Sequence, residues 1–422
     1  MRLYDTSAPF FLMRSRLFKL AAVSMPSAIV AVLLAAAAVE GWTRIHWDAT
    51  KGTPGFFLSD PSRRQRLAPG YSGWFAGVPV KINSLGLRDR REYALPKSAD
   101  TIRVLVLGDS VAFGHGSVEE HTYPFLLEQR LRAWRPDVDW QVWNAAVPGY
   151  NTSQELAHLL DVGPTFQPDV VVVAFFENDI VDNYPVARAT ALSRLRSAIL
   201  SSLYRHVYSI QLYKRAYLQL AWRLSASNDY RLRLEHVAEE TQLTANLQQV
   251  ADLKDQQLTE FDRLGDNDVR AARCDEEVPA RGDIVAAIQR EPGYGAWLEA
   301  VRRLQQLARS APYTLMFFAN VAPMSCAHPD VFYDGGTADL NRFYLRILGD
   351  GTPAVSSYDA FRHVRPSQMP QAAGHALGNS NVVKADVLFG FLRNTLLPSL
   401  KEGRTAAILH RAPPPRGGRA QS

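Results

Sequence analysis

One stretch constrains the fold more than any other. Residues 102–110 read Ile-Arg-Val-Leu-Val-Leu-Gly-Asp-Ser, an apolar segment that stops abruptly at a glycine, an acid and a serine. Such a run, bounded by charge and glycine, is typical of a strand buried on both faces of a parallel sheet. Ligand sites in these sheets lie at the carboxyl ends of the strands. Ser110 is therefore a candidate nucleophile, although a serine here also suits the N-cap of a following helix.

Further segments repeat this pattern along the chain. They predict strands near 102–107, 140–145, 169–176, 313–320 and 353–357, and helices near 123–134, 153–160 and 382–397. Strands that alternate with helices imply a parallel sheet with helices on both faces. We expect a three-layer α/β/α domain with about five central strands.

Composition divides the chain into five parts. We expect a cytoplasmic N-terminus (1–19), a transmembrane anchor (20–40), a juxtamembrane collar of loops and short strands (41–100), the α/β domain (101–400) and a disordered tail (401–422). A helix-rich insertion, about residues 185–295, interrupts the α/β domain. It suits a helical elaboration packed on the sheet, or a lid or protein-partner surface.

The stretch Leu20–Val39 contains no charged side chain. Twenty apolar residues in a helix span about 30 Å of hydrocarbon. Four basic residues and one acid precede it, a bias that keeps the N-terminus in the cytoplasm and exports the rest. A cleaved signal peptide is the alternative, since Ala35–Ala38 offers small residues to a peptidase. We favour a retained anchor because the apolar run is long, which predicts a single-pass inner-membrane protein with a periplasmic domain.

Charge and cysteine content narrow the function classes. The net charge is +5 and the basic residues are scattered, so no nucleic-acid surface is predicted. The chain has two cysteines, Cys274 and Cys326. In an oxidising compartment they can pair, and two unrelated buried thiols are equally consistent with the sequence.

Two further strand ends carry groups suited to acyl transfer. Residues 144–152 follow the second strand and contain Gly149, and Asn178 follows the third. In a doubly wound sheet these ends lie on the same edge as Ser110. The backbone N–H groups of Ser110 and Gly149 and the Asn178 amide can form an oxyanion hole. Taken singly, Gly149 also suits a turn and Asn178 a loop cap.

These three blocks resemble the SGNH hydrolases, also called the GDSL esterase/lipase family. "VLVLGDSVAFGHG" is similar to the family's first block, "NAAVPGYNTSQE" to the second and "VVVAFFENDI" to the third, and the upstream "NSLGLRD" resembles a lead-in of membrane-anchored bacterial members. The resemblance implies a flavodoxin-like domain, Ser110 as nucleophile, and an oxyanion hole of Ser110, Gly149 and Asn178. It also implies hydrolysis or transfer of acyl esters without a metal or cofactor.

The fourth block departs from the family pattern, which is Asp-x-x-His before the last helix. Residues 366–379 read PSQMPQAAGHALGN, and two alignments compete. In one, Met369 replaces the catalytic histidine. In the other, which we favour because a base is needed, His375 is that base. The family aspartate is missing under both. Asp359 is a candidate orienting acid, His363 is a further candidate base, and a Ser-His dyad is another solution.

Three functions remain open at this point. The first is an esterase or O-acyltransferase acting on acyl esters of an envelope glycan or lipid. The second is a catalytically impaired relative that binds an envelope component. The third, less favoured, is a flavodoxin-like cofactor domain, because the loop after the first strand has too little glycine to cradle a phosphate. A distance above about 5 Å between His375 Nε2 and Ser110 Oγ would exclude the dyad.

Overall fold

A computed structural model describes most of the chain. The described residues are 8–47, 52–181, 183, 186, 188–210, 212–213, 284–322, 324–325, 332–333, 337–364, 371–372, 375–400 and 403–410. Cys274, Cys326 and Met369, together with the middle of the insertion, lie outside them.

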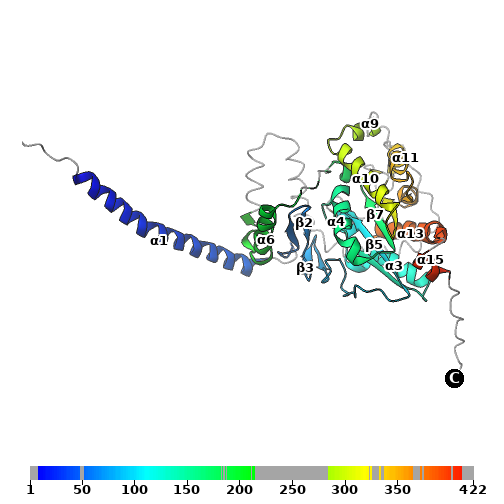
Figure 1. Ribbon diagram of the computed structural model, residues 1–422, viewed down its shortest axis with the longest axis horizontal. Coiled ribbons are helices and arrows are strands. Elements are labelled where there is room, and N and C mark those ends of the chain that lie inside the picture. The colour runs from blue at the N-terminus through cyan, green and yellow to red at the C-terminus, as the bar shows by residue number, and fades with distance from the viewer. Residues whose placement is uncertain are drawn as a thin grey trace, which may run out of the picture.

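The core of the fold is a five-stranded parallel sheet in the order β11-β8-β7-β5-β6 (Figure 1). This order, in which the chain runs outward in both directions from β5, is that of a flavodoxin-like doubly wound sheet. The predicted fold class is therefore confirmed. The strands are β5 (Thr101–Gly108), β6 (Asp139–Asn144), β7 (Val170–Phe175), β8 (Thr314–Ala319) and β11 (Ala354–Ser356).

Strand β5 is buried along its whole length because helices cover both faces of the sheet. Val104 and Val106 face a core that includes α3 and α13, the collar and the C-terminal helix α15. Leu105 and Leu107 face the opposite core, built with α4, α10 and α11. Alternating side chains therefore fill two cores, which explains why the segment reads as continuously apolar. The helices that form these layers are α3 (Tyr123–Trp134), α4 (Thr152–Phe166), α10 (Tyr294–Ala308), α11 (Thr337–Leu348), α13 (Asn379–Phe391) and α15 (Gly403–Leu409).

Short elements complete the domain around these layers. Three brief helices, α2, α5 and α12, directly follow strands of the sheet, and α13 continues through a π-helical turn. These elements are α2 (Ser110–Phe113), η2 (Glu119–His121), α5 (Asn178–Val181), α9 (Ile284–Gln289), α12 (Tyr358–Phe361), η4 (Leu392–Leu396) and α14 (Leu397–Ser399). The two-residue strands are β9 (Met324–Ser325), β10 (Phe332–Tyr333), β12 (Gln371–Ala372) and β13 (His375–Ala376).

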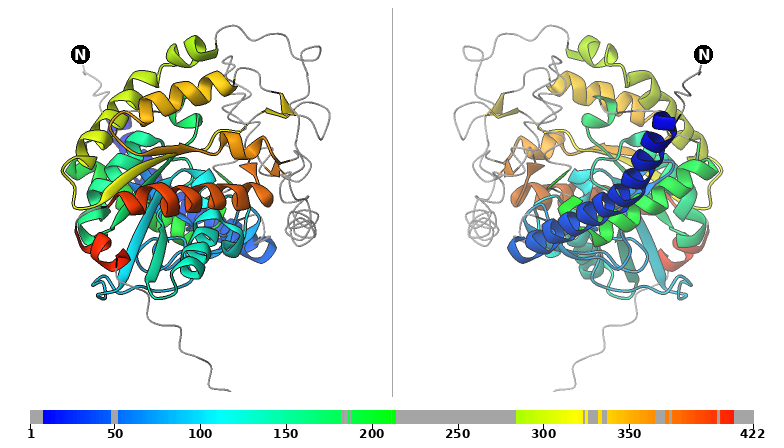
Figure 2. Two further views of the ribbon diagram at one scale, coloured as in Figure 1. Left: turned by 90° about the vertical axis from the view of Figure 1, so that its right-hand side faces the viewer. Right: turned by 90° about the vertical axis from the view of Figure 1, so that its left-hand side faces the viewer.

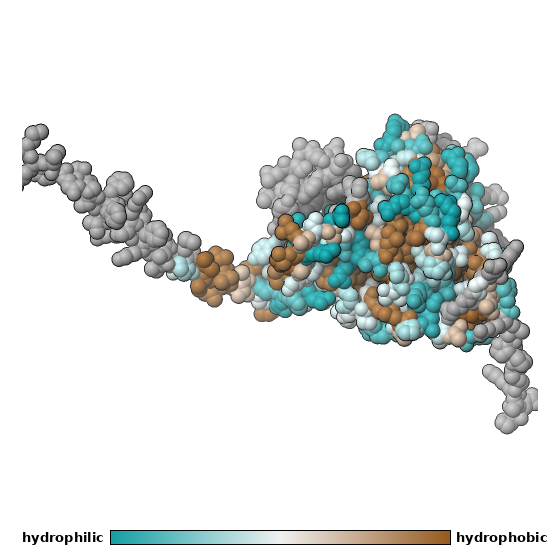
Figure 3. All heavy atoms as spheres, in the orientation of Figure 1, coloured by the Kyte–Doolittle hydropathy of each residue, from teal (hydrophilic) through white to brown (hydrophobic). Residues whose placement is uncertain are grey.

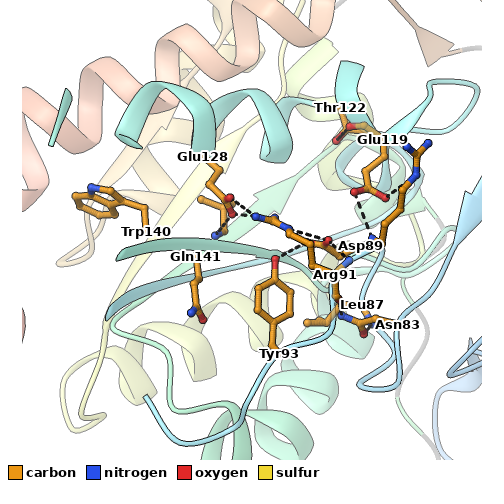
Figure 4. A network of polar contacts seen from close by, with 12 residues as sticks. Asn83, Leu87, Asp89, Arg91, Tyr93, Glu119, Thr122, Glu128, Trp140 and Gln141 are labelled. Atoms are coloured by element: carbon orange, nitrogen blue, oxygen red, sulfur yellow. Dashed lines mark hydrogen bonds and ion pairs between the residues drawn. The ribbon is translucent and has the colours of Figure 1, made fainter. Parts of the chain in front are cut away.

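The collar, residues 41–100, contains two antiparallel hairpins. They are β1 (Phe57–Asp60) with β2 (Arg64–Leu67), and β3 (Ser72–Phe75) with β4 (Val78–Lys81). The chain then returns to the sheet through an ionic network (Figure 4). Arg91 lies between Asp89 and the buried Glu128 of α3, with Nη2–Oδ2 and Nη1–Oε1 distances of 2.8 and 2.5 Å. Glu128 also accepts the Val142 N–H of the edge strand at 2.8 Å, so one carboxylate joins collar, helix and sheet.

Helix α1 (Ala8–His46) projects from the domain at the N-terminal side (Figures 1 and 2). Among the described residues, Pro26–His46 is long and apolar enough to cross a membrane, and it is almost entirely outside the protein core. The insertion begins with α6 (Ala191–His206), which lies between α1 and the collar hairpins (Figure 1).

The ordered chain extends further than its composition suggests. Residues 403–409, which the sequence analysis placed in a disordered tail, form α15. Ala406 and Ile408 are 2% and 3% exposed. Thr405 Oγ1 donates to Asp169 Oδ1 at 3.1 Å. These few apolar side chains anchor the helix, and average composition conceals them.

Gly108 is expected to be a sharp stability determinant. A Cβ at this position would overlap Ala112 Cβ and come within 3.2 Å of Ala174 Cβ, where β5 turns into α2. We expect Gly108→Ala to lower the free energy of unfolding by about 1–3 kcal/mol, because overpacking forces the backbone to shift. Denaturant unfolding of the purified protein measures it. Gly295→Ala is the control, since that exposed glycine of α10 has open space around it. An unchanged stability for Gly108→Ala would contradict this account.

Candidate active site

Ser110 lies at the carboxyl end of β5, where the strand turns into α2. Asp109 is the N-cap of α2, and its Oδ1 accepts the Val111 N–H at 2.8 Å. The cap is therefore Asp109 rather than Ser110, which leaves the serine side chain free of the capping role. Ser110 is partly exposed, whereas Asp109 is fully buried. The serine hydroxyl is therefore accessible at the strand end, while the neighbouring aspartate is buried.

The structure brings His375 to this hydroxyl. Nε2 of His375 lies 2.7 Å from Ser110 Oγ, although 265 residues separate the two in the chain. His375 begins β13, which pairs with β12 in a short hairpin, with Ala372 opposite His375. A histidine nitrogen at hydrogen-bond distance from a serine hydroxyl can accept its proton. The distance is well below the limit set for excluding the dyad.

Asn178 reaches the same strand edge from the end of β7. Its Nδ2 donates to Asp109 Oδ2 at 3.1 Å, so the first and third sequence blocks meet through one hydrogen bond. The second block joins them through α4, because Thr152 Oγ1 donates to Asp179 Oδ2 at 3.1 Å. These contacts orient the Asn178 amide beside the nucleophile strand. An amide so oriented has a second N–H with which to bind an oxyanion.

Gly149 lies in an exposed turn after β6. Its φ of 78° is in the left-handed region, which favours glycine. Gln65 of the collar supports this turn, because its Nε2 donates to the Pro148 carbonyl at 2.7 Å. Asn151 then caps α4 in a reciprocal capping box with Gln154. Gln65 and the Asn151 capping box thus hold the turn on both sides. The N–H at its centre is that of Gly149, which has no side chain.

The other sequence candidates lie elsewhere. Asp359 is exposed in the first turn of α12, and within the described ranges no hydrogen bond or ion pair joins it to His375. His363 is exposed just beyond α12. Neither side chain has a position in the described structure that links it to Ser110.

Two residues near the base were not singled out by sequence reasoning as catalytic. His115 is 5% exposed and its ring stacks on that of His375, with centroids 4.4 Å apart and an interplanar angle of 19°. Asp109 is fully buried at the end of β5. Burial raises the pKa of Asp109, and the His375 charge opposes that rise. His115 follows Ser110 by five residues, so proximity in sequence was the available signal.

Arg88 organises the loop that carries His115. Its Nη1 donates to the carbonyls of Phe113 and Gly114 at 2.6 and 2.7 Å, and its Nη2 donates to that of Ser117. Burial lowers the pKa of Arg88 to about 9, with Glu119 and Glu120 opposing the shift. Asn144 adds a second clamp, because its Nδ2 donates to the Phe113 carbonyl at 3.3 Å. The "NSLGLRD" stretch, which includes Arg88, was the sequence signal for this role.

A buried acidic residue lies behind the site. Glu155 of α4 is fully buried, and within the described part of the chain neither of its carboxylate oxygens has a hydrogen-bond partner. Burial raises the pKa of Glu155 well above its usual range, and the nearby Asp179 and Asp109 raise it further. Glu155 therefore favours the neutral form. On the other side, burial lowers the pKa of Lys384 to about 8, and Asp109 opposes that shift.

A serine at a strand end with a histidine on its hydroxyl is an arrangement that serine hydrolases use, and here the Asn178 amide lies beside the same strand end. Across the described residues, no group of three or more His, Cys, Asp or Glu side chains is arranged to bind a metal ion.

Comparison with protein families finds one match. Residues 106–266 match the model of the GDSL-like lipase/acylhydrolase family. The resemblance predicted from the sequence is confirmed, and so is the predicted kind of enzyme, an ester hydrolase. A search of curated proteins finds no match.

Two solved structures are similar in fold. One is a catalytic mutant of an acetylxylan esterase from Geobacillus stearothermophilus, with 12% identity, a TM-score of 0.36, and coverage of 69% of this chain and 93% of that one. The other is an α/β-hydrolase enzyme from the metagenome of Lake Arreo, with 14% identity, a TM-score of 0.33, and coverage of 68% and 94%.

Arg88 and Arg90 provide a matched pair for testing the loop clamp. We expect Arg88→Met to lower the free energy of unfolding by about 3 kcal/mol, because buried carbonyls lose a charged donor. It should also lower esterase activity, since the loop carries His115. Arg90→Met removes a half-exposed arginine whose ion pair with Glu120 lies on the surface, and should change stability by under about 1 kcal/mol. Equal effects of the two variants would refute the clamp.

Glu155 predicts a pH-dependent stability. The pKa of Glu155 is raised in the folded protein, so the unfolded chain releases this proton first as pH rises above about 4.5. Wild-type stability should then fall by up to about 1.4 kcal/mol per pH unit until the folded pKa is reached. Glu155→Gln removes that slope and is expected to be more stable than wild type at pH 8.

Urea unfolding at several pH values between 5 and 8 measures this difference. The exposed Glu299→Gln on α10 is the matched control and should keep the wild-type slope. A Glu155→Gln variant destabilised equally at every pH would show that the carboxyl contributes only a structural contact.

Proposed function

We propose that this chain is a membrane-anchored SGNH-type serine esterase whose active site faces out of the cytoplasm. Ser110 is the nucleophile and His375 is the general base. The observation that carries the proposal is the 2.7 Å distance between His375 Nε2 and Ser110 Oγ. It favours an enzyme over a binding protein, because a binding cleft has no need of a base on a serine.

The proposed reaction follows from the positions of these groups. Ser110 Oγ attacks the ester carbonyl while His375 Nε2 takes its proton. The negative oxygen of the tetrahedral intermediate binds the N–H groups of Ser110 and Gly149 and the amide of Asn178. His375 then returns the proton to the departing alcohol, leaving an acyl-serine. Water attacks that ester in a hydrolase, whereas a second alcohol attacks it in an acyltransferase.

The absence of the family aspartate needs a substitute in this scheme. That acid normally orients the histidine and stabilises its cation. Here His115 stacks against the His375 ring and restrains its plane. The charge of His375 opposes the rise in the pKa of the buried Asp109, so a charged Asp109 and a positive His375 favour each other. We infer that the His115 ring and this buried acid support the Ser110–His375 pair.

The proposed substrate is an O-acylated glycan or lipid of the cell envelope. Support comes from α1, whose exposed apolar segment suits a single membrane span. The basic residues before that segment favour a cytoplasmic N-terminus and therefore a periplasmic domain. An anchored esterase meets esters of its own compartment first. The partially exposed Ser110 and the exposed turn at Gly149 leave the strand edge accessible to a bulky substrate.

Hydrolysis of p-nitrophenyl acetate and labelling by a fluorophosphonate test the mechanism. Ser110→Ala should abolish both. His375→Gln should lower kcat by about 10²–10⁴, the usual contribution of a general base. Asn178→Ala should lower it by about 10²–10³, as expected for one oxyanion donor.

His363→Gln is the control, because this exposed histidine lies twelve residues before His375 in the sequence. Its activity should equal that of wild type. The proposal fails if wild-type protein is not labelled at Ser110, or if His363→Gln, and not His375→Gln, loses activity.

A further inference from the structure

Helix α6 presents its hydrophobic side chains away from the protein. Leu192, Leu195, Ile199 and Leu203 are 76%, 60%, 54% and 40% exposed. Their spacing of three and four residues places them along one side of the helix. A contiguous apolar stripe of this kind on a soluble surface marks a site of interaction.

The opposite side of α6 is attached to the collar by polar contacts. Ser201 Oγ accepts the Ser59 N–H at 3.0 Å, and Ser59 Oγ donates to Ser197 Oγ at 3.1 Å. Ser197 is buried, at 8% exposed. The helix therefore packs on β1 through a face that includes these serines, and the four exposed apolar side chains lie outside that contact.

The C-terminal end of α6 is joined to the end of α1. Glu40 accepts the backbone N–H groups of Tyr208 and Ser209 at 3.0 and 2.8 Å. Arg44 Nη2 donates to the His206 carbonyl at 2.5 Å, and its guanidinium lies 4.7 Å from the centroid of the Tyr208 ring. The C-terminal ends of α1 and α6 are thus adjacent (Figure 1).

This end of α1 is itself exposed and apolar. Trp42 and Ile45 are 59% and 79% exposed, and hydrophobic residues continue along the described part of α1 away from the domain (Figure 3). Three arginines of α6, Arg194, Arg196 and Arg205, are also exposed. Apolar residues beside basic ones, at the point where a membrane helix enters the domain, match the composition of an interfacial helix.

We propose that α6 lies in the bilayer surface, with its stripe in the boundary between headgroups and acyl chains and its arginines on anionic phospholipids. This inference rests on the proposed membrane anchor. With α1 as a flexible single attachment, the domain could tilt freely. A second attachment through α6, rigidly joined to the collar, would hold the site at a constant height and orientation above the membrane.

The test uses the full chain in vesicles of phosphatidylcholine and phosphatidylglycerol. A small fluorescent amino acid is incorporated by codon suppression at position 199, within the stripe, or at position 299, which is exposed on α10, and both native cysteines stay in place. The label at 199 should be quenched by nitroxide-bearing lipids and shielded from aqueous iodide. The label at 299 should show the opposite pattern.

Vesicle flotation of the same samples separates this inference from the proposed anchor. If the chain floats and the label at 199 is quenched by iodide, the anchor stands and the interfacial helix is refuted. A label at 199 shielded from both quenchers also refutes it, because protein from the same chain or a second copy then covers the stripe. A chain that fails to float overturns both. Esterase activity enters none of these measurements.

Discussion

The buried carboxyl of Asp109 is the group on which the candidate site depends. One oxygen caps α2 through the Val111 N–H, and the other accepts the Asn178 amide. The charge of His375 also acts on this carboxyl. The strand end that carries Ser110, the Asn178 amide and His375 therefore all interact with one fully buried residue. Placing a carboxyl there carries a desolvation cost, which the cap, the amide and a positive histidine each offset.

The ionisable groups near the Asp109 carboxyl are shifted toward their neutral forms. Glu155 is a second buried acid, and burial together with the charges of Asp179 and Asp109 raises its pKa, so its carboxyl favours the neutral form. Lys384 approaches from α13 with a pKa lowered to about 8. Burial disfavours the charged form of each group, so it raises the pKa of Asp109 and of Glu155 and lowers the pKa of Lys384.

The collar is part of the site rather than a spacer. Arg88 fixes the carbonyls of the loop that carries His115, and Gln65 supports the turn at Gly149. Arg91 and Glu128 then join the collar to α3 and to the edge strand. Through β1 the same collar contacts α6, which in turn contacts α1. A continuous set of polar contacts therefore connects the N-terminal helix to the nucleophile loop.

The sequence by itself determined the sheet, its strands and the three strand-end blocks. Burial on both faces leaves continuous apolar runs, and the blocks are local in sequence, so Ser110, Gly149 and Asn178 could be chosen from pattern alone. The sequence did not decide which residue is the base. Met369 and His375 are six positions apart, and no local rule says which of them lies at the sheet edge. Packing of a two-residue hairpin places His375 there. The roles of Arg88 and His115 also depended on tertiary structure, since each acts through contacts between segments that are not adjacent in sequence. Average composition likewise did not predict α15, in which Ala406 and Ile408 are buried and Thr405 bonds to Asp169.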